Sequence, residues 1–151
     1  RKKALIWTDV TIVQTGLKRS LMKQWGLESV CYIHDPEIFQ KAQEEKTTRA
    51  VAGLRSLAEK KIESPLILVI GDAPTALLEA AKLTSNNDLK VDLIIGIPVG
   101  FVGTEESKTA LSQQSATPYI TNSGTRGGST VAASIFNALM IWSLKEQEFT
   151  P

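Results

Sequence analysis

The sequence is poor in several residue types on which whole classes of protein depend. Its 151 residues contain one cysteine, one histidine and 6% aromatic residues. A single cysteine excludes an internal disulfide framework and a zinc site built from several cysteines. It is also typical of a reducing compartment, so we expect a cytoplasmic protein. No apolar run approaches the roughly 20 residues that a membrane-spanning helix needs, and we expect neither a membrane partner nor a signal peptide.

The chain also lacks an excess of charge of either sign. Lysine and arginine together number 17, aspartate and glutamate 16, which leaves a net charge of +1. This balance gives no electrostatic footprint for nucleic acid, so we expect no nucleic-acid partner. Hydrophobic residues at 42% and charged residues at 22% are ordinary globular values. The length is that of one domain, and we treat residues 1–151 as a single domain.

Short apolar runs predict the strands of a parallel sheet, because they are nearly continuous rather than alternating. These runs cover residues 4–8, 30–33, 66–70 and 93–97, with a weaker one at 119–121. Helical spacing predicts helices over 48–61, from Pro74 onward, over 105–113 and over 129–144. Strands that alternate with helices predict an α/β fold: a flavodoxin-like, doubly wound, mostly parallel sheet of about five strands. In this prediction Cys31 lies inside the second strand.

In such a sheet the site lies at the carboxyl ends of the strands. The loop that follows the third run starts at Gly71, which permits a tight turn, and leads into a helix that opens with Pro74 and Thr75. The free backbone N–H groups of that helix start could bind an anion. The alternative interpretation is an ordinary turn in which Asp72 caps the helix.

Two further loops are rich in glycine. Residues 96–103 hold three glycines and a proline, which suits a close approach of main chain to a flat ligand; the alternative is a constrained loop capped by Thr104. Residues 122–130 combine glycines with Arg126 ahead of a helix, which could hold carboxylates or phosphates. A flexible loop with a solvated arginine remains the alternative there. No glycine is followed by the lysine of a nucleotide P-loop.

Two charged residues stand at other helix and strand ends. Arg49 lies in the first turn of a predicted helix, where a cation is unfavourable, so it hints at a ligand contact; a solvated arginine is the alternative. His34 follows the second run and is beside Asp35. It could act as a general acid or base, or simply be a turn residue.

The three loops together resemble the precorrin-8X methylmutase family. The matching segments are IGDAPTAL at 70–77, IGIPVGFVGTEESK at 95–108 and GTRGGS at 124–129, supported by Thr8-Asp9 and Thr48-Arg49. The resemblance covers essentially the whole chain in unbroken order.

This resemblance implies an isomerase of cobalamin biosynthesis. It would move a methyl group from C-11 to C-12 of precorrin-8X, or of cobalt-precorrin-8, to give hydrogenobyrinate or cobyrinate, without a cofactor or a metal centre of its own. The family acts as a homodimer with its site near the subunit boundary.

The resemblance also bears on the amino-terminal end of the chain. The family's catalytic histidine belongs to a segment that would lie upstream of Arg1, the first residue of this sequence. We therefore expect the chain to be incomplete at its amino-terminal end relative to the family. We assign no catalytic residue here, and we do not transfer that role to His34.

The residues that bind the corrinoid substrate are implied in the same way. Arg49 matches the family arginine that contacts the substrate, and Asp72 stands where the family commonly has asparagine. The expected substrate-binding residues are Asp9, Thr48, Arg49, Asp72, Ala73, Thr75, Pro98, Val99, Gly100, Arg126, Gly127, Gly128 and Ser129. Two other functions stay open at this stage. One is a corrinoid-binding module without turnover. The other is a nucleotide or flavin-binding protein, which the missing phosphate motifs disfavour.

Overall fold

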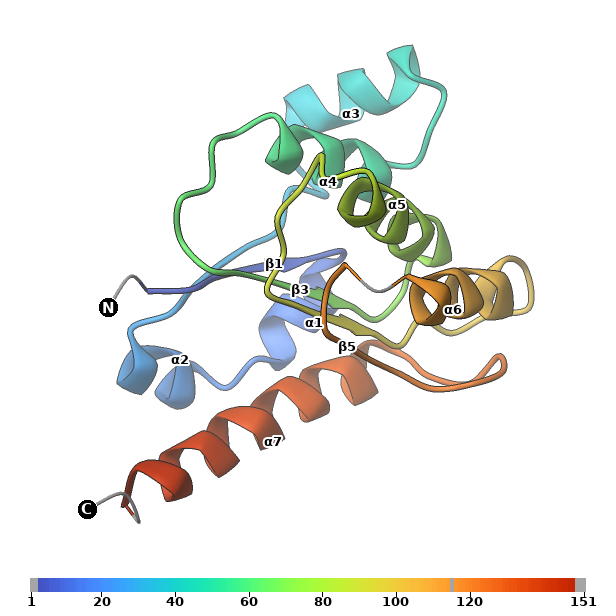
Figure 1. The fold of residues 1–151 in the computed structure, drawn as a ribbon. Helices are drawn as coiled ribbons and strands as arrows, with labels where there is room; N and C mark the ends of the chain where they lie inside the picture. Colours follow the sequence, from blue (N-terminus) through green and yellow to red (C-terminus); the bar gives the residue numbers. More distant parts are fainter. Residues whose placement is uncertain (1–2, 115, 149–151) are drawn as a thin grey trace.

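The protein folds into one parallel sheet covered by helices on both faces, as seen in a computed structural model that describes residues 3–114 and 116–148. Figure 1 shows α3, α4, α5 and α6 on one side of the sheet and α1, α2 and α7 on the other. The strands are β1 Leu5–Thr8, β2 Glu28–Val30, β3 Leu66–Ile70, β4 Leu93–Gly96 and β5 Tyr119–Thr121. The helices are α1 Thr11–Gly16, α2 Arg19–Trp25, α3 Pro36–Glu44, α4 Arg49–Ala58, α5 Pro74–Ser85, α6 Thr104–Gln113 and α7 Ser129–Glu148.

The strand order is β2-β1-β3-β4-β5 and every pairing is parallel. This is the flavodoxin-like order, so the predicted fold class is confirmed. Successive strand residues alternate between two apolar layers. Trp7, Leu68 and Ile94 pack with α4, α5 and α6, whereas Ile6, Val69 and Ile95 pack with α1, α2 and α7. Burial on both faces explains why the strands read as continuous apolar runs.

One expectation concerns the chain before β1. Arg1 lies outside the described residues, and so does any segment upstream of it. The expectation that the family's histidine belongs upstream of Arg1 is therefore not tested by the fold and stays a prediction.

The second strand differs from its prediction at residues 30–33. It occupies Glu28–Val30, and the chain then turns, with the N–H of Asp35 donating to the carbonyl of Tyr32 at 3.0 Å before Pro36 starts α3. The side chains of Tyr32 and Ile33 pack against the layer that contains α4. This packing explains the apolar run at residues 30–33, although the run does not continue the strand. Cys31 consequently lies just beyond the strand and is partly buried.

Three helices, α1, α2 and α3, were not predicted from the sequence. They are 6, 7 and 9 residues long, and none has a side-chain cap. The helices that were predicted begin close to the expected positions, and α5 begins at Pro74 itself. Within the described part of the chain, no helix is both long enough and apolar enough to cross a membrane.

Charged side chains tie α3, α4 and α5 together on the outer side of their layer. Arg55 of α4 bonds Glu45 and Glu79, each at 2.8 Å, and Lys41 of α3 lies 2.6 Å from Glu59. The bonds to Glu79 and Glu45 raise the pKa of the Arg55 guanidinium further above its usual range. These ion pairs join the last turn of α4 to α5 and to the end of α3.

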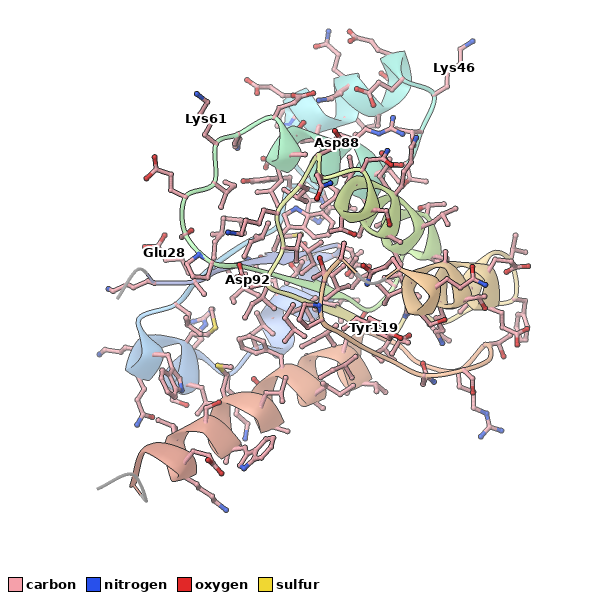
Figure 2. The ribbon with its side chains drawn as sticks, in the orientation of Figure 1. Glu28, Lys46, Lys61, Asp88, Asp92 and Tyr119 are labelled. Atoms are coloured by element: carbon pink, nitrogen blue, oxygen red, sulfur yellow. The ribbon has the colours of Figure 1, made fainter. Side chains whose placement is uncertain are left out.

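The amino edge of the sheet is occupied by structural contacts. It carries Glu28, Asp92 and Tyr119, which Figure 2 labels, while Lys46 and Lys61 extend outward from the α3 and α4 side. Asp92 accepts a hydrogen bond from the N–H of Leu66 at 2.9 Å, and the hydroxyl of Tyr119 lies 3.3 Å from the carbonyl of Ser112. These contacts join neighbouring segments, which leaves the opposite edge as the place to look for a ligand site.

Candidate functional site

The loops singled out from the sequence meet at the carboxyl edge of the sheet. They follow β3, β4 and β5, and because all strands run in the same direction, these loops emerge on one side, together with Asp9 after β1. The amino-terminal starts of α4, α5, α6 and α7 lie at this edge as well, since each helix runs back antiparallel to the strands. The chain thereby collects most of its glycine-rich backbone at one place.

A buried carboxylate organises the first of these loops. Asp9, at the end of β1, is 1% exposed and accepts three backbone N–H groups: Gly71 at 3.1 Å, Asp72 at 2.8 Å and Ala73 at 2.7 Å. These N–H groups directly precede the helix start from which the sequence predicted an anion site, and a side chain 62 residues before Gly71 binds them. Asp9 therefore shapes the loop through its backbone.

The alternative of an Asp72 cap is wrong. The residue in the N-cap position of α5 is Ala73, and it makes no side-chain cap. The side chain of Asp72 is exposed instead. The negative charge favoured near a helix start is supplied by Asp9 from another strand, so Asp72 is free to face a ligand.

Burial raises the pKa of the Asp9 carboxyl above its ordinary value of 3.8, and the three N–H bonds, which favour the ionised form, offset only part of that rise. The folded state then binds a proton more tightly than the unfolded state does. We expect wild type to gain stability relative to Asp9→Asn as the pH falls from neutral through the raised folded-state pKa of Asp9 toward 3.8. Denaturant unfolding of both proteins measures this difference. A shift in favour of the variant at low pH would mean that the three N–H bonds outweigh burial.

The loops after β4 and β5 are hydrogen-bonded to each other. The N–H of Gly128 donates to the carbonyl of Ile97 at 2.8 Å, and the N–H of Gly100 donates to the carbonyl of Thr125 at 3.1 Å. A Cβ on Gly127 would overlap the carbonyl oxygen of Ile97 and lie 2.7 Å from that of Pro98. Only glycine permits this approach, so the two loops form one continuous wall.

A buried lysine is hydrogen-bonded to the backbone of the loop after β5. Lys108 of α6 is 3% exposed, and its Nζ donates to the carbonyls of Arg126 at 2.6 Å and Gly124 at 2.9 Å. Burial lowers the pKa of the Lys108 ammonium, and nearby Glu105 acts in the opposite direction. The interpretation in which Thr104 caps the same helix is wrong. The N-cap residue is Gly103, which has no side chain that could cap the helix.

Two threonines and an arginine join the site from α4 and α5. The hydroxyl oxygens of Thr48 and Thr75 lie 3.1 Å apart, and Thr48 also caps α4 by accepting the N–H of Val51. Arg49 is exposed, with one guanidinium nitrogen donating to the carbonyl of Ile33 at 3.3 Å. The threonine contact places the start of α4 directly beside the start of α5.

The expected binding residues differ in how accessible they are. Asp9 and Pro98 are buried and act on the loops from within. The others are exposed or partly exposed: Thr48, Arg49, Asp72, Ala73, Thr75, Val99, Gly100, Arg126, Gly127, Gly128 and Ser129. His34 is exposed in the turn after β2, next to the carbonyl that Arg49 contacts. Among the described residues, no group of three or more histidine, cysteine or acidic side chains could hold a metal ion.

Apolar side chains at this edge were not singled out from the sequence. Phe101 is 96% exposed and Val102 is 89% exposed, both in the loop after β4. Ile12 of α1 is 71% exposed beside an open apolar hollow of about 390 Å³ between α1 and α7. Isolated exposed apolar residues are ordinary, whereas Phe101 and Val102 are adjacent and lie in a glycine-rich loop of the candidate site.

The comparisons with known proteins agree with this architecture. The family model described as precorrin-8X methylmutase matches residues 1–142. A cobalt-precorrin-8 methylmutase of Leptospira interrogans is 36% identical over 98% of this chain and 70% of its own length. Those of Salmonella typhimurium and Priestia megaterium are 40% and 41% identical, over 93% and 88% of this chain. The chain spans 64% and 58% of the length of these two relatives.

Solved structures show the same relationship. The structure titled precorrin-8X methylmutase related protein superposes with a TM-score of 0.80 at 34% identity, covering 93% of this chain and 72% of that one. The precorrin-8x methyl mutase from Thermus thermophilus gives a TM-score of 0.83 at 29% identity, covering 95% and 68%. From the sequence match along residues 1–142 and the shared fold, it follows that the chain belongs to the precorrin-8X methylmutase family.

Proposed function

We propose that the protein to which this chain belongs is the isomerase that moves a methyl group from C-11 to C-12 of precorrin-8X or cobalt-precorrin-8. The observation that carries the proposal is the single wall formed by the loops after β4 and β5, which lies at the same edge of the sheet as the Asp9-supported loop and the start of α4 with Arg49. A large flat ring with many carboxylates needs such a wall of exposed main chain, flanked by cations.

Each part of the site has a role in this proposal. The guanidinium groups of Arg49 and Arg126 bind carboxylates of the substrate, a geometry for which arginine is well suited. The exposed side chains of Val99 and Phe101 cover apolar parts of the macrocycle. Asp9 and Lys108 hold the loops in place from behind.

The proposed reaction requires the chain mainly to hold the substrate in position. The methyl shift is intramolecular, so no second substrate has to be bound, and a rigid pocket that holds the ring near its reactive geometry lowers the barrier. The proton that assists the shift comes, in this proposal, from the family's histidine upstream of Arg1 rather than from His34. A cytoplasmic homodimer, in which the exposed Val102 contacts the partner, completes the proposal.

The first test is a visible-absorption titration of the protein with hydrogenobyrinic acid, the cobalt-free product. We expect binding that weakens in Arg49→Ala by roughly 5- to 150-fold, the equivalent of about 1–3 kcal/mol for a lost charged hydrogen bond. Arg49→Lys keeps the charge and should lose less. Arg19→Ala removes an exposed arginine on the other face of the sheet and should bind like wild type.

Either of two results would count against the proposal. One is the absence of binding by wild type, and the other is an equal loss in Arg49→Ala and Arg19→Ala. Turnover is then followed by absorbance, because substrate and product are isomers of equal mass. Binding without any spectral conversion, by a protein that also carries the upstream histidine, would identify a corrinoid-binding module instead.

A further inference from the structure

The ammonium of Lys108 lies in an unusual place for a lysine. It projects from the inner side of α6, is 3% exposed, and reaches two backbone carbonyls, those of Gly124 and Arg126. Burying an ammonium is costly unless acceptors replace its water. Both acceptor carbonyls belong to the loop between β5 and α7, which carries Arg126.

The carbonyl of Arg126 receives a second donor. The side-chain amide of Asn122 donates to it at 2.9 Å, in addition to the bond from Lys108 at 2.6 Å. A carbonyl oxygen has two lone pairs, so these two donors use both and fix the direction in which the peptide group points. The next peptide is fixed as well, because the N–H of Gly128 donates to Ile97.

The orientation of two carbonyls determines the orientation of two N–H groups. The described peptides are all trans, and in a trans peptide the N–H points opposite to the C=O. With the carbonyls of Gly124 and Arg126 directed at Lys108, the N–H groups of Thr125 and Gly127 are directed away from it. Within the described part of the chain, neither N–H has an acceptor.

We propose that Lys108 is a positioning residue for corrinoid binding: it turns the Gly124–Thr125 and Arg126–Gly127 peptides so that their N–H groups and the Arg126 side chain face a carboxylate of the ligand. This inference rests on the proposed function of the site. Lys108 does not contact the ligand itself, and its effect passes through the loop that it holds.

The experiment uses Lys108→Met, which keeps the length of the side chain but removes its donors, beside Lys108→Arg and a control, Lys82→Met, an exposed lysine of α5. Amide hydrogen exchange reports on the loop without any ligand. We expect the Gly128 amide to lose protection in Lys108→Met while the sheet and the middle of α7 keep theirs. Lys108→Arg should restore part of the protection, and Lys82→Met should match wild type.

Titration with hydrogenobyrinic acid gives the second readout. We expect affinity to fall about tenfold or more in Lys108→Met, with recovery in Lys108→Arg. Arg126→Ala provides the coupling test. If Lys108 acts by positioning Arg126 and its peptide, Lys108→Met should reduce the affinity clearly less in the Arg126→Ala background than in wild type.

Several results would overturn the inference. One is that the Gly128 amide keeps its protection from exchange in Lys108→Met. Another is that this protection is lost while the affinity for hydrogenobyrinic acid is unchanged. A third is that the losses of affinity in Lys108→Met and Arg126→Ala are fully additive. Failure of wild type to bind the corrinoid refutes the proposed function, and the positioning role falls with it. If Lys108→Met does not fold, Asn122→Ala removes the other donor to the same carbonyl from an exposed position and should show the same pattern to a smaller degree.

Discussion

Replacement of Asp9 by alanine should lower the free energy of unfolding by about 3–5 kcal/mol, a loss well above that of an ordinary point mutation. The carboxylate is 1% exposed and is the acceptor for three consecutive backbone N–H groups. Alanine removes the acceptor and leaves these donors inside or near the protein interior, where each unpaired donor costs about 1–3 kcal/mol. Water reaching Asp72 and Ala73 recovers part of the loss. Urea unfolding followed by circular dichroism measures it.

A matched surface variant shows whether the effect comes from these contacts. Asp88, labelled in Figure 2, is an exposed aspartate after α5, and Asp88→Ala should change stability by less than about 0.5 kcal/mol. Asp9→Asn keeps one acceptor oxygen, so its loss of stability should lie between those of Asp9→Ala and Asp88→Ala. A loss below about 1 kcal/mol in Asp9→Ala would mean that solvent replaces the carboxylate and that the loop does not depend on it.

Replacement of Gly127 by alanine should damage both stability and ligand binding. The added Cβ would overlap the carbonyl oxygen of Ile97, a backbone atom that cannot rotate away. Relieving that overlap moves the loop off the end of β4 and breaks the bond from Gly128 to Ile97. We expect a loss of about 1–3 kcal/mol in stability, as for other overpacked sites. Affinity for hydrogenobyrinic acid should fall at least about tenfold.

Gly124 in the same loop provides the control for this variant. It has a φ of 78°, which favours glycine, but a Cβ there would meet nothing within 4 Å. Gly124→Ala should therefore cost about 1–2 kcal/mol in stability through backbone conformation alone, with a smaller effect on affinity. Equal losses of affinity in the two variants would show that any stiffening of the loop is harmful and that the contact with Ile97 has no special role.

The parts of the fold that follow from local physics were predictable. Strand β3 and the start of α5 at Pro74 were placed correctly, because a continuous buried run and a first-turn proline are strong local signals. The short helices α1 and α2 were missed, since six or seven residues without a side-chain cap carry little pattern. Strand β2 was shifted because apolar residues after it serve packing against α4.

The site was predictable in outline but not in its internal contacts. Glycines and prolines after β3, β4 and β5 marked the loops, and the parallel sheet placed them at one edge. The bond between Asp9 and a loop 62 residues later, and that between Lys108 and Arg126, depend on tertiary placement. A lysine in a polar helix and an aspartate after a strand look the same in sequence whether they face solvent or the backbone of another loop.

The way in which Asp9 holds its loop has a consequence for how the site can evolve. All three of its bonds go to main-chain N–H groups, which every residue except proline provides. The path of the backbone at positions 72 and 73 is therefore independent of the side chains carried there, and that of Asp72 is exposed. Substitutions at these two positions can change the chemistry presented to a ligand while the scaffold beneath them stays the same. Asp72, standing where the family resemblance implies an asparagine, is the kind of variation that such a scaffold tolerates.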